Sequence, residues 1–179
     1  ADSTLVIGTD DAGHNLRCAS VAPVAARHAV QNVAKILNLK PHTVLPWTES
    51  HRGVTVHCAA DVEIHRSNVD DRIYVIDAAR LFPPTRPSKR TAAEHLTQQF
   101  RPELMVDLGR LSSDHRLRCF NLPKRLSSDA YSSFGRHRAR EHNVEVDRGT
   151  KYVGKFLVKV VASQLISAGP GGSGLKPSS

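Results

Sequence analysis

Apolar and polar residues alternate in short runs through the first half of the chain, and this pattern predicts β-strands. Leu5–Ile7 precede a turn-rich segment, Gly8–Gly13, beyond which Leu16 would complete a hairpin. Further stretches rich in β-formers lie between turn residues at Val44–Trp47, Val54–Cys58, Val62–Ile64 and Ile73–Ile76. We therefore expect a small mixed or antiparallel sheet.

Helical spacing replaces this alternation from Ser20 to Leu39. Ser20 can cap the helix and Pro23 suits its first turn, while Pro41 ends the run. The apolar residues of one face are Ala26, Val30, Val33 and Leu37. Further helices are expected at Thr91–Phe100 and Pro102–Leu111, and the repeated tetrapeptide Leu-Ser-Ser-Asp, at 111–114 and 126–129, predicts two helix caps.

The end of the chain combines a helical stripe with a polar tail. Beyond Asn143 the stripe consists of Val146, Val153, Phe156, Leu157, Val160, Val161 and Leu165, with lysines opposite, so we expect this helix to cover the core. Residues 169–179 are rich in Gly, Ser and Pro and are expected to be disordered. The prediction is a single domain over residues 1–168, of class α/β or α+β, with about five helices around the sheet.

Composition is typical of a folded domain rather than of a membrane protein. Of 179 residues, 40% are apolar and 23% charged, and no apolar run approaches the roughly 20 residues of a membrane-spanning helix. Residues 1–4 show no signal peptide and no initiator Met, so we expect part of a larger polypeptide. Three separated cysteines, Cys18, Cys58 and Cys119, favour a reducing, cytoplasmic location.

Positive charge is concentrated in the second half. Residues 1–80 carry 8 Lys and Arg against 9 Asp and Glu, whereas residues 81–179 carry 17 against 8, a net charge of +9. The densest basic group is Arg116, Arg118, Lys124, Arg125, Arg136, Arg138 and Arg140, with Tyr131 and Phe134 between them. Basic side chains interleaved with aromatic ones suit phosphate contact and base stacking, so we expect RNA or an acidic protein surface as partner. A solvated helical face remains the alternative.

The stretch Asp61–Pro84 carries the most unusual pattern: Asp-Val-Glu-Ile-His, then Asp-Arg-Ile-Tyr-Val-Ile-Asp-Ala-Ala-Arg, then Phe-Pro-Pro. With Leu37–His42 before it and Arg101–Leu104 and Leu126–Phe134 after it, this order of motifs resembles the clustered-mitochondria (Clu) domain from about Gly8 to Phe134. One departure is Asp71 before Arg72, where the family usually has Gly. The resemblance implies a large cytosolic protein that affects mitochondrial distribution and is linked to messenger RNA, and it supplies no catalytic residue.

The same residues also resemble the catalytic and metal-binding loops of kinase-like phosphotransferases. In that alternative Glu63 would be the catalytic base, and Asn68 with Asp77 would hold Mg²⁺ on the phosphates of ATP. The chain has no G-x-G-x-x-G loop and no V-A-I-K lysine. The remaining interpretation is structural: a β-hairpin in which Asp77 pairs with Arg72 or Arg80. We expect a non-catalytic interaction module without a cofactor.

Overall fold

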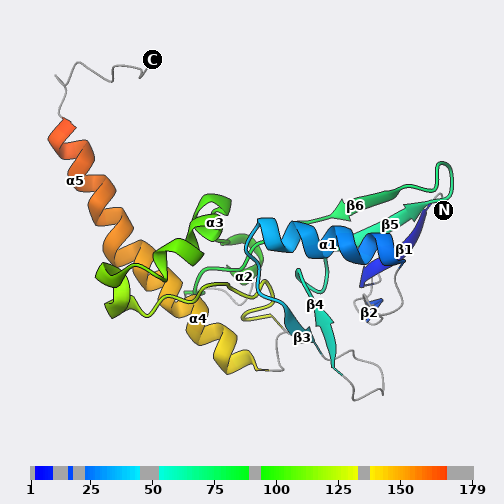
Figure 1. Ribbon diagram of the computed structural model, residues 1–179, viewed down its shortest axis with the longest axis horizontal. Coiled ribbons are helices and arrows are strands. Elements are labelled where there is room, and N and C mark those ends of the chain that lie inside the picture. Colours follow the sequence, from blue (N-terminus) through cyan, green and yellow to red (C-terminus); the bar gives the residue numbers. More distant parts are fainter. Residues whose placement is uncertain are drawn as a thin grey trace.

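The computed structural model describes residues 3–9, 16–17, 23–44, 53–88, 94–132 and 138–168. The elements, in chain order (Figure 1), are β1 (Ser3–Thr9), β2 (Leu16–Arg17), α1 (Val24–Ile36), β3 (His42–Val44), β4 (Val54–Val56), β5 (Glu63–Ser67), β6 (Ile73–Asp77), α2 (Glu94–Thr97), α3 (Pro102–Leu111), the 3-10 helix η1 (His115–Phe120), α4 (Ala139–Tyr152), a π-helical turn (Val153–Leu157) and α5 (Val158–Ala168). The four-stranded sheet lies at one end of the molecule and α5 at the other.

The strands form two antiparallel sheets, which confirms an α+β architecture. The larger sheet has the order β2-β1-β5-β6, and the smaller pairs β3 with β4. Thr9 pairs with Leu16 as the predicted first hairpin requires. In the described part of the chain the helices number four rather than about five, because α4, the π-helical turn and α5 run on without a break.

Gly8 allows β1 to approach the start of β5. Its φ of +122° lies in the region that L side chains rarely adopt. A Cβ atom at this position would lie 2.7 Å from the Val62 carbonyl oxygen. The glycine is therefore needed for close strand contact, while most of the predicted 8–13 turn lies outside the described residues.

The β5–β6 hairpin turns at Ser67–Arg72 without glycine. Asp71 takes a positive φ of 61°, a conformation that Asp tolerates better than most residues. The Arg66 guanidinium donates to both Asp71 carboxylate oxygens, from Nε at 2.5 Å and from Nη2 at 2.6 Å. Asp71 thus occupies the position at which the resemblance leads one to expect Gly, and its carboxylate forms a solvent-exposed ion pair with Arg66.

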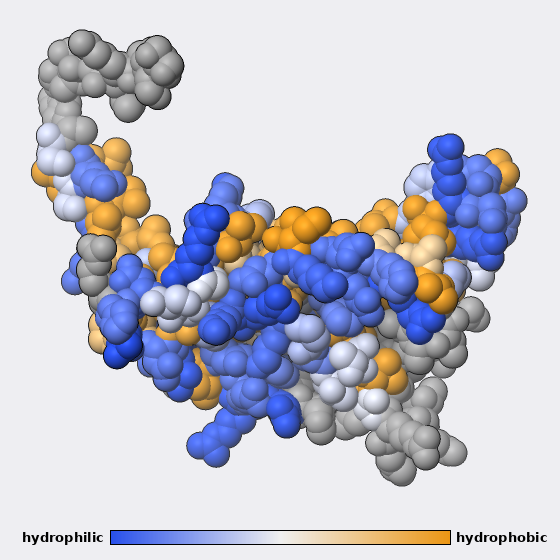
Figure 2. Space-filling model, in the orientation of Figure 1, coloured by the Kyte–Doolittle hydropathy of each residue, from blue (hydrophilic) through white to orange (hydrophobic). Residues whose placement is uncertain are grey.

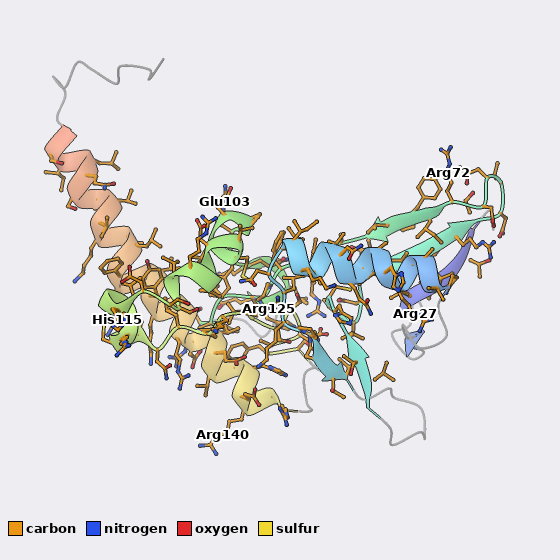
Figure 3. The ribbon with its side chains drawn as sticks, viewed as in Figure 1. Arg27, Arg72, Glu103, His115, Arg125 and Arg140 are labelled. Carbon is orange, nitrogen blue, oxygen red and sulfur yellow. The ribbon has the colours of Figure 1, made fainter. Side chains whose placement is uncertain are left out.

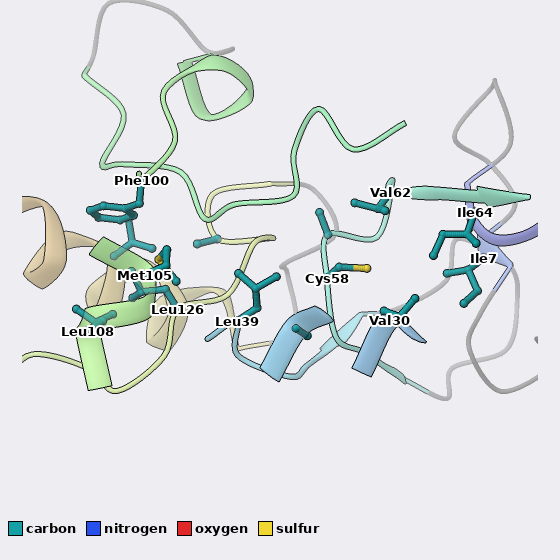
Figure 4. Packing of buried hydrophobic residues seen from close by; sticks show 14 of the residues in the cluster. Ile7, Val30, Leu39, Cys58, Val62, Ile64, Phe100, Met105, Leu108 and Leu126 are labelled. Atoms are coloured by element: carbon teal, nitrogen blue, oxygen red, sulfur yellow. The ribbon is translucent and has the colours of Figure 1, made fainter. Parts of the chain in front are cut away.

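Helix α1 packs on the sheet through small and branched side chains. Ala26, Val30 and Ala34 are buried at a spacing of four residues, against Val62 and Ile64 (Figure 4). The predicted face was partly wrong, because Val33 is 45% exposed and Ala34 takes its place in the core. The helix is also shorter than the predicted 20–39, and residues 20–22 lie outside the described part.

A second part of the same core joins the sheet to the helices. Leu39 and Leu126 form an isolated parallel bridge, and around them pack Phe100, Met105 and Leu108 (Figure 4). Each fully buried side chain of this size contributes about 1.5–3 kcal/mol to folding. Helix α3 has the predicted bounds with Pro102 in its first turn, whereas the described helix in the predicted 91–100 segment is only Glu94–Thr97.

The last helix packs on the core through α4 and through Val153 and Leu157 of the π-helical turn. It begins at Ala139 rather than after Asn143, and Val146 and Tyr152 are buried. Beyond the π-helical turn the side chains of residues 158–167 are all exposed, and α5 leaves the body of the molecule (Figure 1). The prediction that the whole stripe covers the core is therefore wrong for α5.

Candidate functional site

Asp129 is the centre of a buried network of charged groups. Its side chain has no solvent exposure. Oδ2 accepts hydrogen bonds from His42 Nε2 at 2.7 Å and from the Ala60 backbone N–H at 2.9 Å, and Oδ1 accepts one from Arg80 Nη2 at 2.9 Å. The Asp129 carboxylate therefore joins three other parts of the chain: β3, the segment before β5 and the segment after β6.

Arg80 extends the network to a second carboxylate. Its Nε and Nη2 atoms donate to the two oxygens of Asp61 at 2.6 and 2.7 Å, which is the bidentate geometry typical of an Arg–carboxylate pair. The Arg80 side chain is only 7% exposed. The structural interpretation of the hairpin was therefore wrong about its partners: Arg80 pairs with Asp61 and Asp129, Arg72 lies 3.8 Å from Asp70, and Asp77 accepts from the Ala79 N–H.

The neighbours of Asp129 stabilise its charged form. Burial alone would raise the pKa of this carboxyl, but the hydrogen bond and charge of His42, the charge of Arg80 and the Ala60 N–H together lower it. The pKa of Arg80 is raised, because the two carboxylates outweigh the cost of its burial. The nearby Cys58 thiol has its pKa raised to about 12 by burial and by the negative charges of Asp129 and Asp61, so it is not a nucleophile.

His42 also faces a second acceptor. Its Nδ1 lies 3.0 Å from the Lys40 carbonyl oxygen, while its Nε2 lies against Asp129. The ring also meets His142 edge-on, with the centroids 5.8 Å apart. Both carboxylate oxygens of Asp129 therefore accept hydrogen bonds from the protein, and the network links segments that are distant in the sequence.

The second Leu-Ser-Ser-Asp sequence builds this network rather than a helix cap. Ser127 and Ser128 are buried, and Ser128 Oγ donates to the Leu81 carbonyl oxygen at 2.7 Å. Asp129 accepts the bonds described above, and the backbone turns at 128–131. The predicted cap at 126–129 is therefore wrong, whereas the first copy, at 111–114, does lead from α3 into η1.

The three residues of the phosphotransferase alternative do not come together. Glu63 and Asp77 are paired across the start of β5 and the end of β6. Asn68 follows the other end of β5. Five residues of extended chain separate it from Glu63, a distance of about 16 Å. There the Asn68 Oδ1 accepts a hydrogen bond from the Thr4 hydroxyl at 3.4 Å. Asp77 is exposed. Mg²⁺ shared by Asn68 and Asp77 would need them at one point, and within the described ranges no group of three His, Cys, Asp or Glu side chains could hold a metal ion.

The predicted basic residues lie on separate elements. Arg118 is on η1, Lys124 and Arg125 are in the following segment, and Arg138 and Arg140 stand at the start of α4; all five are exposed (Arg125 and Arg140 are labelled in Figure 3). The side chain of Arg116 and the whole of Arg136 and Phe134 lie outside what the structure describes. Tyr131 is half-buried, and its hydroxyl donates to Asp147 at 2.5 Å, so its ring is held in the fold.

Residues 1–86 match the family model described as Clustered mitochondria (CLU). This match confirms the resemblance over the part of the chain that holds His42, Asp61 and Arg80. It ends before Asp129, so the likeness read from 101–104 and 126–134 stays a prediction. No curated protein and no solved structure matches the chain. Among the described helices, none combines the length and apolar composition needed to span a membrane.

Sequence reasoning missed the network itself. His42, Asp61, Arg80 and Asp129 are all members of the motifs that carry the Clu resemblance. The residue types were therefore visible, but each of the first motifs holds several charged or ionisable residues and does not indicate which of them becomes buried. What the sequence lacked was the pairing, since the partners stand up to 87 residues apart.

Proposed function

Starting from the Clustered mitochondria match over residues 1–86, we propose that residues 1–168 form a non-catalytic interaction module of a Clu-like cytoplasmic protein linked to mitochondrial distribution. The module binds RNA or an acidic protein surface through its basic second half. It works as part of a larger polypeptide. No cofactor is required for this role.

The observation that carries this proposal is positive charge left without internal partners. Two acidic residues of α4 are engaged within the fold, since Lys40 Nζ donates to Glu141 at 2.9 Å and to Glu145 at 2.8 Å. By contrast, Lys124 and Arg140 are exposed, and neither forms an ion pair with another described residue. An excess of exposed cations attracts polyanions by long-range steering and by counterion release.

The buried network supports the non-catalytic part of the proposal. A catalytic carboxylate must meet its substrate, yet Asp129 is enclosed by His42, Ala60 and Arg80. Glu63 and Asp77 share one end of the hairpin without Asn68. The fold therefore uses its most strongly coupled ionisable groups to hold segments together.

A polyanion-binding assay with the full chain tests the proposal. Single-stranded RNA and poly-glutamate serve as probes, and the variant combines Arg136→Ala, Arg138→Ala and Arg140→Ala. The matched control removes three cations from the first half: Lys35→Ala, Arg66→Ala and Arg72→Ala. We expect the first variant to bind at least one probe about tenfold more weakly and the control to bind within about twofold of the unmodified chain.

The two probes distinguish the two partners. Loss of RNA binding alone identifies RNA, and loss of poly-glutamate binding alone identifies an acidic protein surface. Equal losses in the variant and its control would show that net charge, rather than this surface, determines binding. Stabilisation of the chain by ATP with Mg²⁺ in a thermal melt would instead favour the phosphotransferase alternative.

A further inference from the structure

Helix α5 exposes its apolar side chains, whereas a surface helix of a globular domain usually buries them against the body of the protein. Val158 is 56% exposed, Leu165 71% and Ile166 81%. Figure 2 shows hydrophobic atoms gathered along this helix where it leaves the body, and Figure 1 shows no other element beside its far end. Single exposed apolar residues are ordinary, but a continuous row along one helix marks an interaction surface.

The exposed row continues a groove on the body of the molecule. A groove of about 520 Å³ lies between α3 and the end of α4, with Leu104, Leu111 and Tyr152 among its lining residues. Val153 and Leu157, at the two ends of the π-helical turn, line this groove and also the apolar strip of α5 that leads to Leu165. From Tyr152 to Leu165 the track is about 20 Å long at 1.5 Å per residue. That length suits a helix of about 14 residues.

The helix that carries the apolar strip has charged residues of one sign. Residues 148–168 include Arg148, Lys151, Lys155 and Lys159 and no acidic residue. None of the four pairs with an acidic side chain among the described residues. On the opposite bank the charges of α3 neutralise each other, since Arg101 pairs with Glu103 at 3.4 Å and Arg110 with Asp107 at 3.6 Å.

We propose that the groove and the apolar face of α5 together bind one amphipathic helix of a protein partner, whose polar flank carries Asp or Glu. Apolar side chains at a spacing of three and four residues would enter the track, and the uncompensated positive charge of residues 148–168 favours a partner with an acidic flank. The inference rests on the proposed role as an interaction module but uses a different surface from Arg136, Arg138 and Arg140.

Two other occupants fit the surface less well. A second copy of α5 would bring the same four cations and no acidic residue to neutralise them. A flat anionic membrane could reach the face of α5, but a flat surface could not fill the groove between α3 and the end of α4. The acidic amphipathic helix satisfies both the shape and the charge.

The test measures binding of a fluorescent model peptide to the full chain. The peptide is a helix of about 14 residues with Leu at a three-and-four spacing and Glu on one flank; a second peptide has the same composition in scrambled order. The variants are Leu165→Asp, which places charge in the track, and Ser163→Asp, which adds the same charge on the exposed polar side of α5. We expect Leu165→Asp to bind the peptide at least about tenfold more weakly and Ser163→Asp to change binding by less than about twofold.

Several results would overturn the proposal. They are equal binding of the scrambled peptide, an equal loss in the two variants, or no binding of the amphipathic peptide. Binding of phosphatidylserine vesicles but not of the peptide would point to a membrane, and a dimer that Leu165→Asp dissociates would point to a second copy. If poly-glutamate binding depends on Arg136, Arg138 and Arg140 while the peptide is not bound, the proposed function stands and this inference falls.

Discussion

At the scale of single residues, Asp129 shows how a buried charge is kept in place. Its carboxylate is fully buried, so His42, Ala60 and Arg80 offset the free-energy cost of removing this charge from water. Such a network is weak evidence for a net gain in stability, because burying the ions costs several kcal/mol. Removal of one member is different, since the others are then left uncompensated.

Asp129→Asn should therefore destabilise the fold strongly. The substitution keeps the size of the side chain but removes the negative charge that faces Arg80 and His42. We expect the free energy of unfolding to fall by about 3 kcal/mol, as measured by urea denaturation. Asp71→Asn is the control, because that carboxylate is 73% exposed and its loss should matter little. An equal effect of the two substitutions would contradict the structural role of the network.

The same residue predicts a dependence of stability on acid. The pKa of Asp129 is lower in the folded chain than its ordinary value of 3.8, so the stability it contributes is present above that value. This stability is lost as the pH falls below 3.8 through the folded pKa. We expect the unfolding free energy of the unmodified chain to drop over this range and that of Asp129→Asn to drop less. Parallel curves for the two proteins would contradict the pKa assignment.

At the scale of elements, the helix 139–168 changes its environment along its length. Val146 is fully buried in α4, whereas Leu165 in α5 is 71% exposed. We expect Leu165→Asp to leave the melting temperature nearly unchanged, because its side chain contributes little to the core. Leu108→Ala, in α3, should cost about 2–5 kcal/mol, since that side chain is 1% exposed. A large loss of stability from Leu165→Asp would mean that α5 packs in the isolated chain.

Sequence patterns located the elements better than they located the surfaces. Strand β6, helix α3 and the β5–β6 hairpin could be predicted because local alternation, Pro102 and the turn residues determine them, whereas β5 runs over Glu63–Ser67 rather than the predicted Val62–Ile64. The exposure of α5 could not, because its apolar stripe looks the same whether it covers the core or awaits a partner. The pairing of Asp129 with His42 could not either, since periodicity carries no information on contacts across 87 residues.

At the scale of the whole molecule, the two halves of the chain differ in what they contain. Residues 1–86, which match the Clustered mitochondria model, hold the sheet and three members of the buried network. Residues 81–179 carry a net charge of +9, and α5 carries the apolar track. Asp129 lies in the second half but closes the network of the first. In the proposed function, this framework positions the basic surface that binds the partner.

The salt dependence of polyanion binding tests this division most directly. Dissociation constants for single-stranded RNA and for poly-glutamate would be measured between about 50 and about 200 mM salt, for the unmodified chain and for the Arg136→Ala, Arg138→Ala, Arg140→Ala variant. If these arginines form the binding surface, the slope of log K against log salt should become shallower by about 2 for RNA, because three phosphate contacts each contribute about 0.7 for a single strand. Unchanged slopes for both probes would contradict the account.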